Sequence, residues 1–325
     1  MPGMHPLDRS ETGLHTLDLM MPFYGDPALF RLAVQSVLDQ DDPRWRLVVI
    51  DDLYPDTGPG EWVIGLDEPR ITYIRNEVNL GVSGNFRKCT ELATAEFTTI
   101  VGCDDLLRPN YVSRIHQLLD DFPDADFVQP GVSVMDASGH DTLPLADRVK
   151  GWYRPNVAGA TALSGEPLAA SLLAGAWTYF PSIAWRTARL RRHGFRTDLD
   201  VALDLALMID IVATGGRLVL DDVPSFQYRR HSGSVSSWKA NDGSRFLEES
   251  GFFAECAQRM TALHWSKAAR IARRHLSSRL NALTRLPSSI GAGDRNGTAL
   301  LLRHVIGRAT PSSAPIAYNN SKGPL

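Results

Sequence analysis

Residues 47–52 read LVVIDD and residues 97–105 read FTTIVGCDD, so each of two short apolar runs ends on a pair of aspartates. Runs of this length, rich in β-branched residues, are typical of strands buried on both faces of a parallel sheet. In open α/β sheets, ligands bind beyond the carboxyl ends of the strands. Four carboxylates at one such edge repel one another unless a cation or hydrogen-bond donors join them. The two runs therefore predict an α/β fold with a ligand site and a metal at this edge.

The composition excludes several other classes of protein. The chain has 325 residues, 43% of them hydrophobic, which is enough for a sizeable core, and its formal net charge of −3 gives no nucleic-acid footprint. Its three scattered cysteines, Cys89, Cys103 and Cys256, indicate neither a disulfide framework nor a zinc site. We expect neither a signal peptide nor a membrane span. These features predict a cytoplasmic protein with no nucleic-acid partner.

Strand and helix patterns alternate along the first 130 residues. Strands are expected at 17–21, 46–50, 71–74 and 97–103, and helices at 27–38, 83–93 and 109–121. Such alternation predicts right-handed βαβ units and a mostly parallel central sheet flanked by helices. Glycine and proline recur over 131–167, which indicates loops or short edge strands there.

The second half contains fewer strand signals. We expect a buried helix followed by a strand within 168–185, a helix at 201–213, a strand at 217–220 and an Arg-rich helical tract at 246–283. The last residues are rich in Pro, Ser and Asn, which is typical of low order. The predicted organisation is a tail at 1–15, a catalytic domain at 16–243, a helical extension at 244–285 and a low-order tail at 286–325.

Six segments resemble, in order, the motifs of family 2 glycosyltransferases, which have the GT-A fold. They are 19–24 (LMMPFY), 48–52 (VVIDD), 79–85 (NLGVSGN), 102–105 (GCDD), 203–207 (LDLAL) and 228–236 (YRRHSGSVS). The resemblance covers about 17–236 and leaves both termini unexplained. It implies a GT-A-like α/β fold and a hexosyltransferase that uses a nucleotide sugar.

The resemblance implies a nucleotide site at the first two motifs. Tyr24 would pack against the base, Pro22 would lie beside it, and Asp52 would accept the imide N–H of uracil or thymine. The implied donor is therefore a UDP- or dTDP-sugar. Asp51 stays open between a ligand-site role and capping of the turn after the strand. Asn79 is expected to shape a turn.

The resemblance also implies a metal and diphosphate site. Asp105 would bind Mg²⁺ or Mn²⁺, which prefer oxygen ligands, and Asp104 would lie nearer the ribose. Arg229 would lie near the diphosphate, and His231 would complete the metal shell. Gly102 departs from the family pattern, because a further aspartate is common at that position.

Asp204 lies in an otherwise apolar helix, and the residues alone leave it open between a paired structural carboxylate and a functional one. The resemblance assigns it as the general base that takes the proton of the acceptor hydroxyl, which implies inversion of configuration. Leu203 departs from the usual Glu. Trp177 and Tyr179 are expected to pack in the core rather than stack on a sugar.

The favoured function is an inverting glycosyltransferase that acts on a saccharide or lipid-linked acceptor in glycan or cell-envelope biosynthesis. An inactive nucleotide- or glycan-binding module is the alternative, because Gly102 and Leu203 depart from the family motifs. A dinucleotide-dependent oxidoreductase is disfavoured, since residues 22–26 lack the G-x-G-x-x-G fingerprint. The basic tract that includes Lys267 and Arg270 is expected to pack on the catalytic domain. The other interpretation is peripheral contact with the inner face of the membrane.

Overall fold

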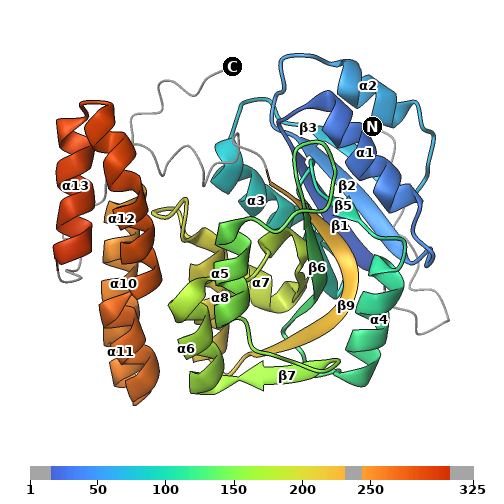
Figure 1. Cartoon of the computed structure of the whole chain (residues 1–325). Helices are drawn as coiled ribbons and strands as arrows, with labels where there is room; N and C mark the ends of the chain where they lie inside the picture. Colours follow the sequence, from blue (N-terminus) through green and yellow to red (C-terminus); the bar gives the residue numbers. More distant parts are fainter. Residues whose placement is uncertain (1–15, 231–243, 308–325) are drawn as a thin grey trace.

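A mixed sheet forms the centre of the computed structural model, which describes residues 16–230 and 244–307 (Figure 1). Within these residues the strand order is β3-β2-β1-β4-β8-β6-β9-β5, and β7 pairs with β9. The strands are β1 (Leu17–Phe23), β2 (Trp45–Asp51), β3 (Ile71–Arg75), β4 (Phe97–Ile100), β5 (Leu106–Leu107), β6 (Phe127–Met135), β7 (Thr161–Ser164), β8 (Ala184–Arg186) and β9 (Arg217–Arg229). The predicted α/β class with helices on a central sheet is confirmed.

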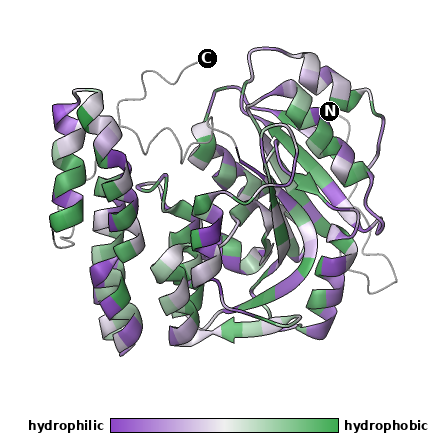
Figure 2. Cartoon of the chain, in the orientation of Figure 1, coloured by the Kyte–Doolittle hydropathy of each residue, from purple (hydrophilic) through white to green (hydrophobic). Residues whose placement is uncertain are grey.

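The first four strands form one parallel block of the sheet, and β6 and β9 form a further parallel pair. β2 and β4 both pair in parallel with β1, one on each side, and β3 extends β2 in parallel. Met20 packs into the core on one face of the sheet and Leu19 into the core on the other, so β1, β2 and β4 are buried on both faces as predicted, whereas the edge strand β3 is only partly buried. Figure 2 shows hydrophobic residues along the central strands and also on the helices around them. The carboxyl ends of β2 and β4 therefore emerge on either side of the end of β1.

The helices of the first half begin and end close to their predicted bounds. They are α1 (Pro27–Leu38), α2 (Gly58–Ile64), α3 (Gly81–Leu92) and α4 (Tyr111–Asp121). Asp26 caps α1, because its Oδ1 accepts hydrogen bonds from Ala28 N at 2.7 Å and Leu29 N at 3.3 Å. Pro27 at the first position suits a helix start. The short helix α2 was not predicted.

The segment 131–167 is more regular than predicted. β6 continues to Met135, and α5 (Leu145–Tyr153) and β7 follow. Gly131 interrupts the β6–β9 register, and a Cβ there would lie 2.6 Å from the carbonyl oxygen of Asp222. Glycine is thus required by the close approach of β9 rather than by a loop. In the sequence alone, a glycine at a β-bulge cannot be distinguished from a glycine at a turn.

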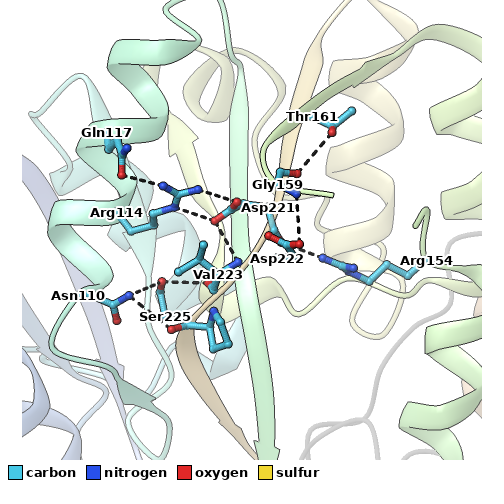
Figure 3. A network of polar contacts seen from close by, with 11 residues as sticks. Asn110, Arg114, Gln117, Arg154, Gly159, Thr161, Asp221, Asp222, Val223 and Ser225 are labelled. Carbon is cyan, nitrogen blue, oxygen red and sulfur yellow. Dashed lines mark hydrogen bonds and ion pairs between the residues drawn. The ribbon is translucent and has the colours of Figure 1, made fainter. Parts of the chain in front are cut away.

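β9 is longer than predicted because it bends at a bulge and continues. Asp221 is buried at the bulge, where its carboxylate accepts two hydrogen bonds from Arg114 of α4, at 2.7 and 2.8 Å (Figure 3). Its carbonyl oxygen accepts from Arg154 at 2.8 Å, and the carboxylate of Asp222 accepts from Gly159 N at 3.2 Å. These contacts brace the bend, after which β9 reaches Arg229.

The middle helices lie between the sheet and the C-terminal helices (Figure 1). They are α6 (Gly165–Gly175), the short 3₁₀ helix η1 (Phe180–Ser182), α7 (Thr187–His193) and α8 (Leu203–Ala213). The helix and strand expected within 168–185 correspond to α6 and β8, and the helix expected at 201–213 corresponds to α8.

The last four helices of the described residues lie together at one end of the molecule (Figure 1). They are α10 (Ser244–Ala262), α11 (Ser266–Arg274), α12 (Leu276–Gly291) and α13 (Arg295–Ile306). Residues 286–306 were expected in a low-order tail, but they form the end of α12 and α13 instead. Asp294 caps α13 through Gly297 N at 2.9 Å, and Leu301 packs in a small core with Phe246. None of the helices in the described ranges is long and apolar enough to cross a bilayer.

Candidate functional site

The end of β1 presents an exposed tyrosine beside residues 102–105, which we call the acidic loop. Tyr24 is 52% exposed, and its ring makes an edge contact with Tyr54 at 5.6 Å between centroids. Gly25 lies so close to Cys103 that a Cβ would be 3.3 Å from the sulfur. Pro22, just before this turn, is in register with Ile50 of β2. The Tyr24 ring therefore lies at the edge of the sheet with a face open to a ligand.

Asp51 is fully engaged within the protein. The buried Oδ1 accepts from Tyr54 N at 2.7 Å, and Oδ2 accepts from Arg75 at 2.7 Å and from the Tyr73 hydroxyl at 2.5 Å. Burial and the hydrogen bond to Asp51 raise the pKa of Tyr73 to about 12. Asp51 was left open between a ligand-site role and capping of the turn after the strand, and these contacts favour capping.

Asp52 is buried but keeps one carboxylate oxygen available. Its Oδ1 accepts from Asn76 Nδ2 at 2.8 Å and Leu80 N at 2.7 Å, and Asn79 donates to its carbonyl oxygen at 2.9 Å. Lys88 donates to Asn76 Oδ1 at 2.6 Å, which fixes the orientation of that amide. No residue in the described part of the chain donates to Oδ2 of Asp52. Asn76 directly follows β3, and its position at a strand end is a signal that could have predicted it as a site residue.

Asp105 is wedged between two stretches of backbone. It is 2% exposed, and its Oδ1 accepts from Arg229 N at 2.8 Å. A Cβ on Gly102 would lie 2.5 Å from its Oδ2, so the glycine allows this close packing. Burial, reinforced by the negative charge of Asp104, raises the pKa of Asp105 well above its ordinary value.

The acidic loop fits a hard divalent cation that is shared with a bound phosphate. Magnesium is commonly held by one or two carboxylates together with substrate phosphates, and Asp104 and Asp105 supply two. Burial is the main cause of the raised pKa of Asp105, and a cation here would offset the repulsion from Asp104 that adds to it. Among the described residues no group of three His, Cys, Asp or Glu side chains could hold a metal. His231 lies outside the described residues.

Arg229 holds the acidic loop through backbone carbonyls. It is buried, and its Nε donates to the carbonyl oxygen of Asp104 at 2.7 Å. Its Nη1 donates to the carbonyl oxygens of Asp136 and Ala137 at 3.3 and 3.2 Å. The guanidinium predicted to lie near a diphosphate thus ties the loop of Asp104 to the turn after β6.

Asp204 lies in the first turn of α8 and forms no ion pair with the described residues. Among the described residues, the donor to its Oδ1 is Leu205 N, at 2.8 Å. Burial raises the pKa of Asp204, while the positive charges of Lys150 and Arg245 act in the opposite direction. Asp210, on the same helix, is instead paired with Arg259. A carboxylate with a raised pKa and no ion pair is suited to accept a proton.

Glu248 of α10 anchors the start of the Asp204 helix. Its Oε1 accepts from Val201 N and Ala202 N, both at 2.8 Å, and its Oε2 accepts from Asp200 N at 3.1 Å. A carboxylate at this place satisfies backbone donors that a helix start leaves unpaired. Glu248 was not predicted, because no local pattern links it to a segment more than 40 residues away.

A polar cluster joins α5 to the end of β9. Arg230 donates to both oxygens of Asp147 at 2.7 Å, and the Tyr179 hydroxyl donates to Oδ1 of Asp147 at 2.8 Å. Lys150 donates to the carbonyl oxygen of Thr178 at 2.9 Å and lies 4.4 Å from the Tyr179 ring centroid. Burial, together with the charge of Arg230, lowers the pKa of Lys150 to about 8. The cluster was missed because 131–167 was expected to form loops.

The two aromatic residues expected in the core have different surroundings. Trp177 is fully buried in the apolar core, as expected. Tyr179 is half-buried and packs against Tyr228 at 5.2 Å between ring centroids, within the polar cluster.

One family model matches the part of the chain that contains Asp52 and the acidic loop. The family model described as glycosyl transferase family 2 matches residues 18–166. The chain is similar to this family over just under half of its length. The match includes Asp52, Asp104 and Asp105 and ends before Asp204, so the role of Asp204 stays a prediction.

Curated relatives are similar over a limited stretch. The putative colanic acid biosynthesis glycosyl transferase WcaA of Escherichia coli (strain K12) is 33% identical over 98 residues, which are 30% of this chain and 35% of WcaA. The uncharacterized glycosyltransferase MJ1057 of Methanocaldococcus jannaschii is 22% identical over 38% of this chain and 44% of its own length. The chain thus spans less than half of these family relatives.

Solved structures share the fold over nearly the whole chain. S. aureus TarS 1-349 in complex with UDP-GlcNAc has a TM-score of 0.59 at 14% identity, covering 89% of this chain and 91% of that one. Mannosyltransferase PcManGT from Pyrobaculum calidifontis, in complex with GDP-Man and Mn²⁺, has a TM-score of 0.56 at 18% identity, covering 90% and 79%. The GT-A fold expected from the family motifs is confirmed.

Proposed function

We propose that the protein is an inverting glycosyltransferase that moves a sugar from a nucleotide sugar to a hydroxyl acceptor. The observation that carries this proposal is Asp204, a carboxylate with a raised pKa and no ion pair among the described residues, in a chain whose residues 18–166 match glycosyl transferase family 2. General bases are held in this state by partial burial.

The donor is proposed to be a UDP- or dTDP-sugar. Oδ2 of Asp52 accepts no hydrogen bond within the described residues and suits the imide N–H of uracil or thymine, while Tyr24 offers its exposed ring to the base and Pro22 lies beside it. The structural neighbours were solved with UDP-GlcNAc and with GDP-Man. Both donors are nucleoside diphosphate sugars, and the Asp52 argument favours a pyrimidine base.

Asp104 and Asp105 are proposed to hold Mn²⁺ or Mg²⁺ together with the donor diphosphate, with His231 as a further ligand. When bound, the cation would neutralise charge that develops on the departing nucleoside diphosphate. PcManGT was solved with Mn²⁺. Arg229 supports this site by keeping the acidic loop in place, because its guanidinium contacts the Asp104 carbonyl oxygen.

In the proposed reaction Asp204 takes the proton of the acceptor hydroxyl while the hydroxyl oxygen bonds to the anomeric carbon. The bond from that carbon to the diphosphate breaks, and its electron pair leaves with the nucleoside diphosphate. Attack opposite the leaving group inverts the anomeric configuration. A saccharide or lipid-linked acceptor in glycan or cell-envelope synthesis is proposed, and the similarity to WcaA, a putative glycosyl transferase of colanic acid biosynthesis, supports it.

Three substitutions test these roles. Asp204→Asn keeps the shape of the side chain but removes the proton acceptor, so transfer should fall by about 10² to 10⁴ while donor affinity changes little. Asp105→Asn should weaken metal-dependent donor binding itself. Asp210→Asn, on the same helix but paired with Arg259, is the matched control and should transfer at the parent rate. Parent-rate transfer by Asp204→Asn would contradict the assignment of the base.

A non-catalytic nucleotide- or glycan-binding module is the second candidate, because Gly102 and Leu203 depart from the family motifs. Metal-dependent release of nucleoside diphosphate from a panel of nucleotide sugars separates the two. Thermal shift with Mn²⁺ and UDP, dTDP, GDP or ADP tests the donor base, since a ligand that binds the folded state raises the melting temperature. Equal stabilisation by all four nucleotides would contradict the proposed role of Asp52.

A further inference from the structure

Positive charge is segregated at the C-terminal end of the chain. Residues 256–293 contain seven Lys and Arg and no Asp or Glu, although the whole chain has a net charge of −3. Residues 256–325 carry eleven basic and one acidic side chain, so the first 255 residues carry 23 basic and 36 acidic ones. Such asymmetry indicates a surface that meets an anionic partner.

The outward face of α12 carries four of the five large apolar side chains of that helix. Leu276, Leu280, Leu283 and Ile290 are 58%, 57%, 48% and 63% exposed. Their spacing of four, three and seven residues places them on one face. The residues that α12 buries are mostly small or polar: Ser278, Ala282, Leu286 and Ser289. A helix that only packed on its own protein would bury its leucines, so this pattern is reversed.

The preceding helix α11 has a cationic outward face. Lys267, Arg270, Arg273 and Arg274 are exposed, while Ala268, Ala269 and Ala272 are buried. Arg273 and Arg274 stand just before Leu276, at the start of the apolar face of α12. The alanine face accounts for the packing predicted from the sequence, and it leaves the cations to the outside.

We propose that the outward faces of α11 and α12 dock this protein onto the surface of a bilayer containing anionic phospholipids. The leucines would enter the boundary between headgroups and acyl chains, and the Lys and Arg side chains would contact headgroup phosphates. Figure 1 shows these helices at one end of the molecule, so such docking leaves the sheet free.

Charge argues against two other occupants of the apolar face. A second copy of the chain would present the same acid-free segment, so two such surfaces would repel each other. Residues 308–325 contain two basic residues and no acidic one, so they cannot neutralise it either. Nucleic acid phosphates would pair with the Lys and Arg side chains, but nucleic acid would not bury the exposed leucines.

Co-sedimentation of the full chain with lipid vesicles tests the proposal. Vesicles of phosphatidylcholine alone are compared with vesicles containing about one third phosphatidylglycerol, at low and high salt. The bound fraction should rise about tenfold or more with phosphatidylglycerol and fall as salt screens the surface. Equal binding to both vesicles, or to neither, would overturn the proposal, and this comparison needs no variant.

Two combined variants locate the surface. Leu276→Ser with Leu280→Ser and Leu283→Ser removes the apolar face, and Arg270→Gln with Arg273→Gln and Arg274→Gln removes cations. Each should lower vesicle binding about tenfold. Leu32→Ser with Ile64→Ser, at 52% and 64% exposed sites of the catalytic domain, is the matched control and should bind as the parent does.

Folding of every variant is checked by circular dichroism, and self-association by light scattering. Parent-like vesicle binding by both combined variants would overturn the proposal. So would an apolar-face variant that loses a dimer while vesicle binding is unchanged, because a second copy would then cover α12. Duplex DNA binding that needs the cations but not the leucines, without vesicle binding, would assign the surface to nucleic acid instead.

Discussion

Replacing Glu248 should disturb the proposed catalytic base from a different helix. Its carboxylate accepts three backbone N–H groups just before α8, at 2.8, 2.8 and 3.1 Å. Hydrogen bonds to a charged group contribute about 1.5–3 kcal/mol each, but three donors share one carboxylate and water can replace part of the loss. Burial also raises the pKa of Glu248, which reduces the net gain. We expect Glu248→Ala to lower the free energy of unfolding by about 2–4 kcal/mol.

The effect on transfer should exceed the effect on donor binding. If α8 loses its anchored start, Asp204 shifts, and a misplacement of about 1 Å in a reacting group can cost about 10² in rate. Urea unfolding and transfer assays on Glu248→Ala measure both quantities. Glu255→Ala is the control on the same helix, because Glu255 is exposed and pairs with Arg196, a contact worth about 1 kcal/mol or less. A Glu248→Ala protein with the parent unfolding midpoint and rate would refute the anchoring argument.

Three further substitutions test the surroundings of the site. Lys150→Met removes a positive charge that lowers the pKa of Asp204, so the acidic limb of the pH profile of kcat/KM should move to higher pH, while Lys150→Arg should leave it in place. Gly102→Ala puts a Cβ 2.5 Å from an oxygen of Asp105, so calorimetric titration should show Mn²⁺-dependent donor affinity reduced about tenfold with little change in melting temperature. Asn76→Ala removes a donor to Asp52 and should cost about 1–3 kcal/mol of stability in urea unfolding, and unchanged stability would show that water replaces the amide.

The first half of the fold could be predicted because its signals are local. Alternating apolar runs and helical spacing, with Pro27 after Asp26, fix β1, α1 and β2 within a residue or two. α5 was missed because its pattern is reversed. It exposes Leu145 and Trp152 and buries Asp147, whose partner Arg230 lies 83 residues away.

The position of the site was also predictable, but not the partners of each residue. The ends of apolar runs place Asp52 and Asp105 at the carboxyl edge of the sheet. Arg75 occupies an oxygen of Asp51, and the backbone N–H of Arg229 binds Asp105. Neither contact can be inferred from the sequence around the aspartate alone. Long-range pairings of this kind follow from the assembled sheet.

The bulge in β9 reverses which face of the sheet the even-numbered and odd-numbered side chains occupy. Gln129 pairs with Leu220 and Val132 with Phe226, so β6 advances three residues while β9 advances six. Leu220 therefore packs into the core on one face of the sheet and Phe226 into the core on the other, although both occupy even positions. Deleting one residue from 221–225 would exchange the faces of Tyr228 and Arg229 and remove the guanidinium from the acidic loop. Changes in the length of this segment should thus be tolerated in steps of two residues.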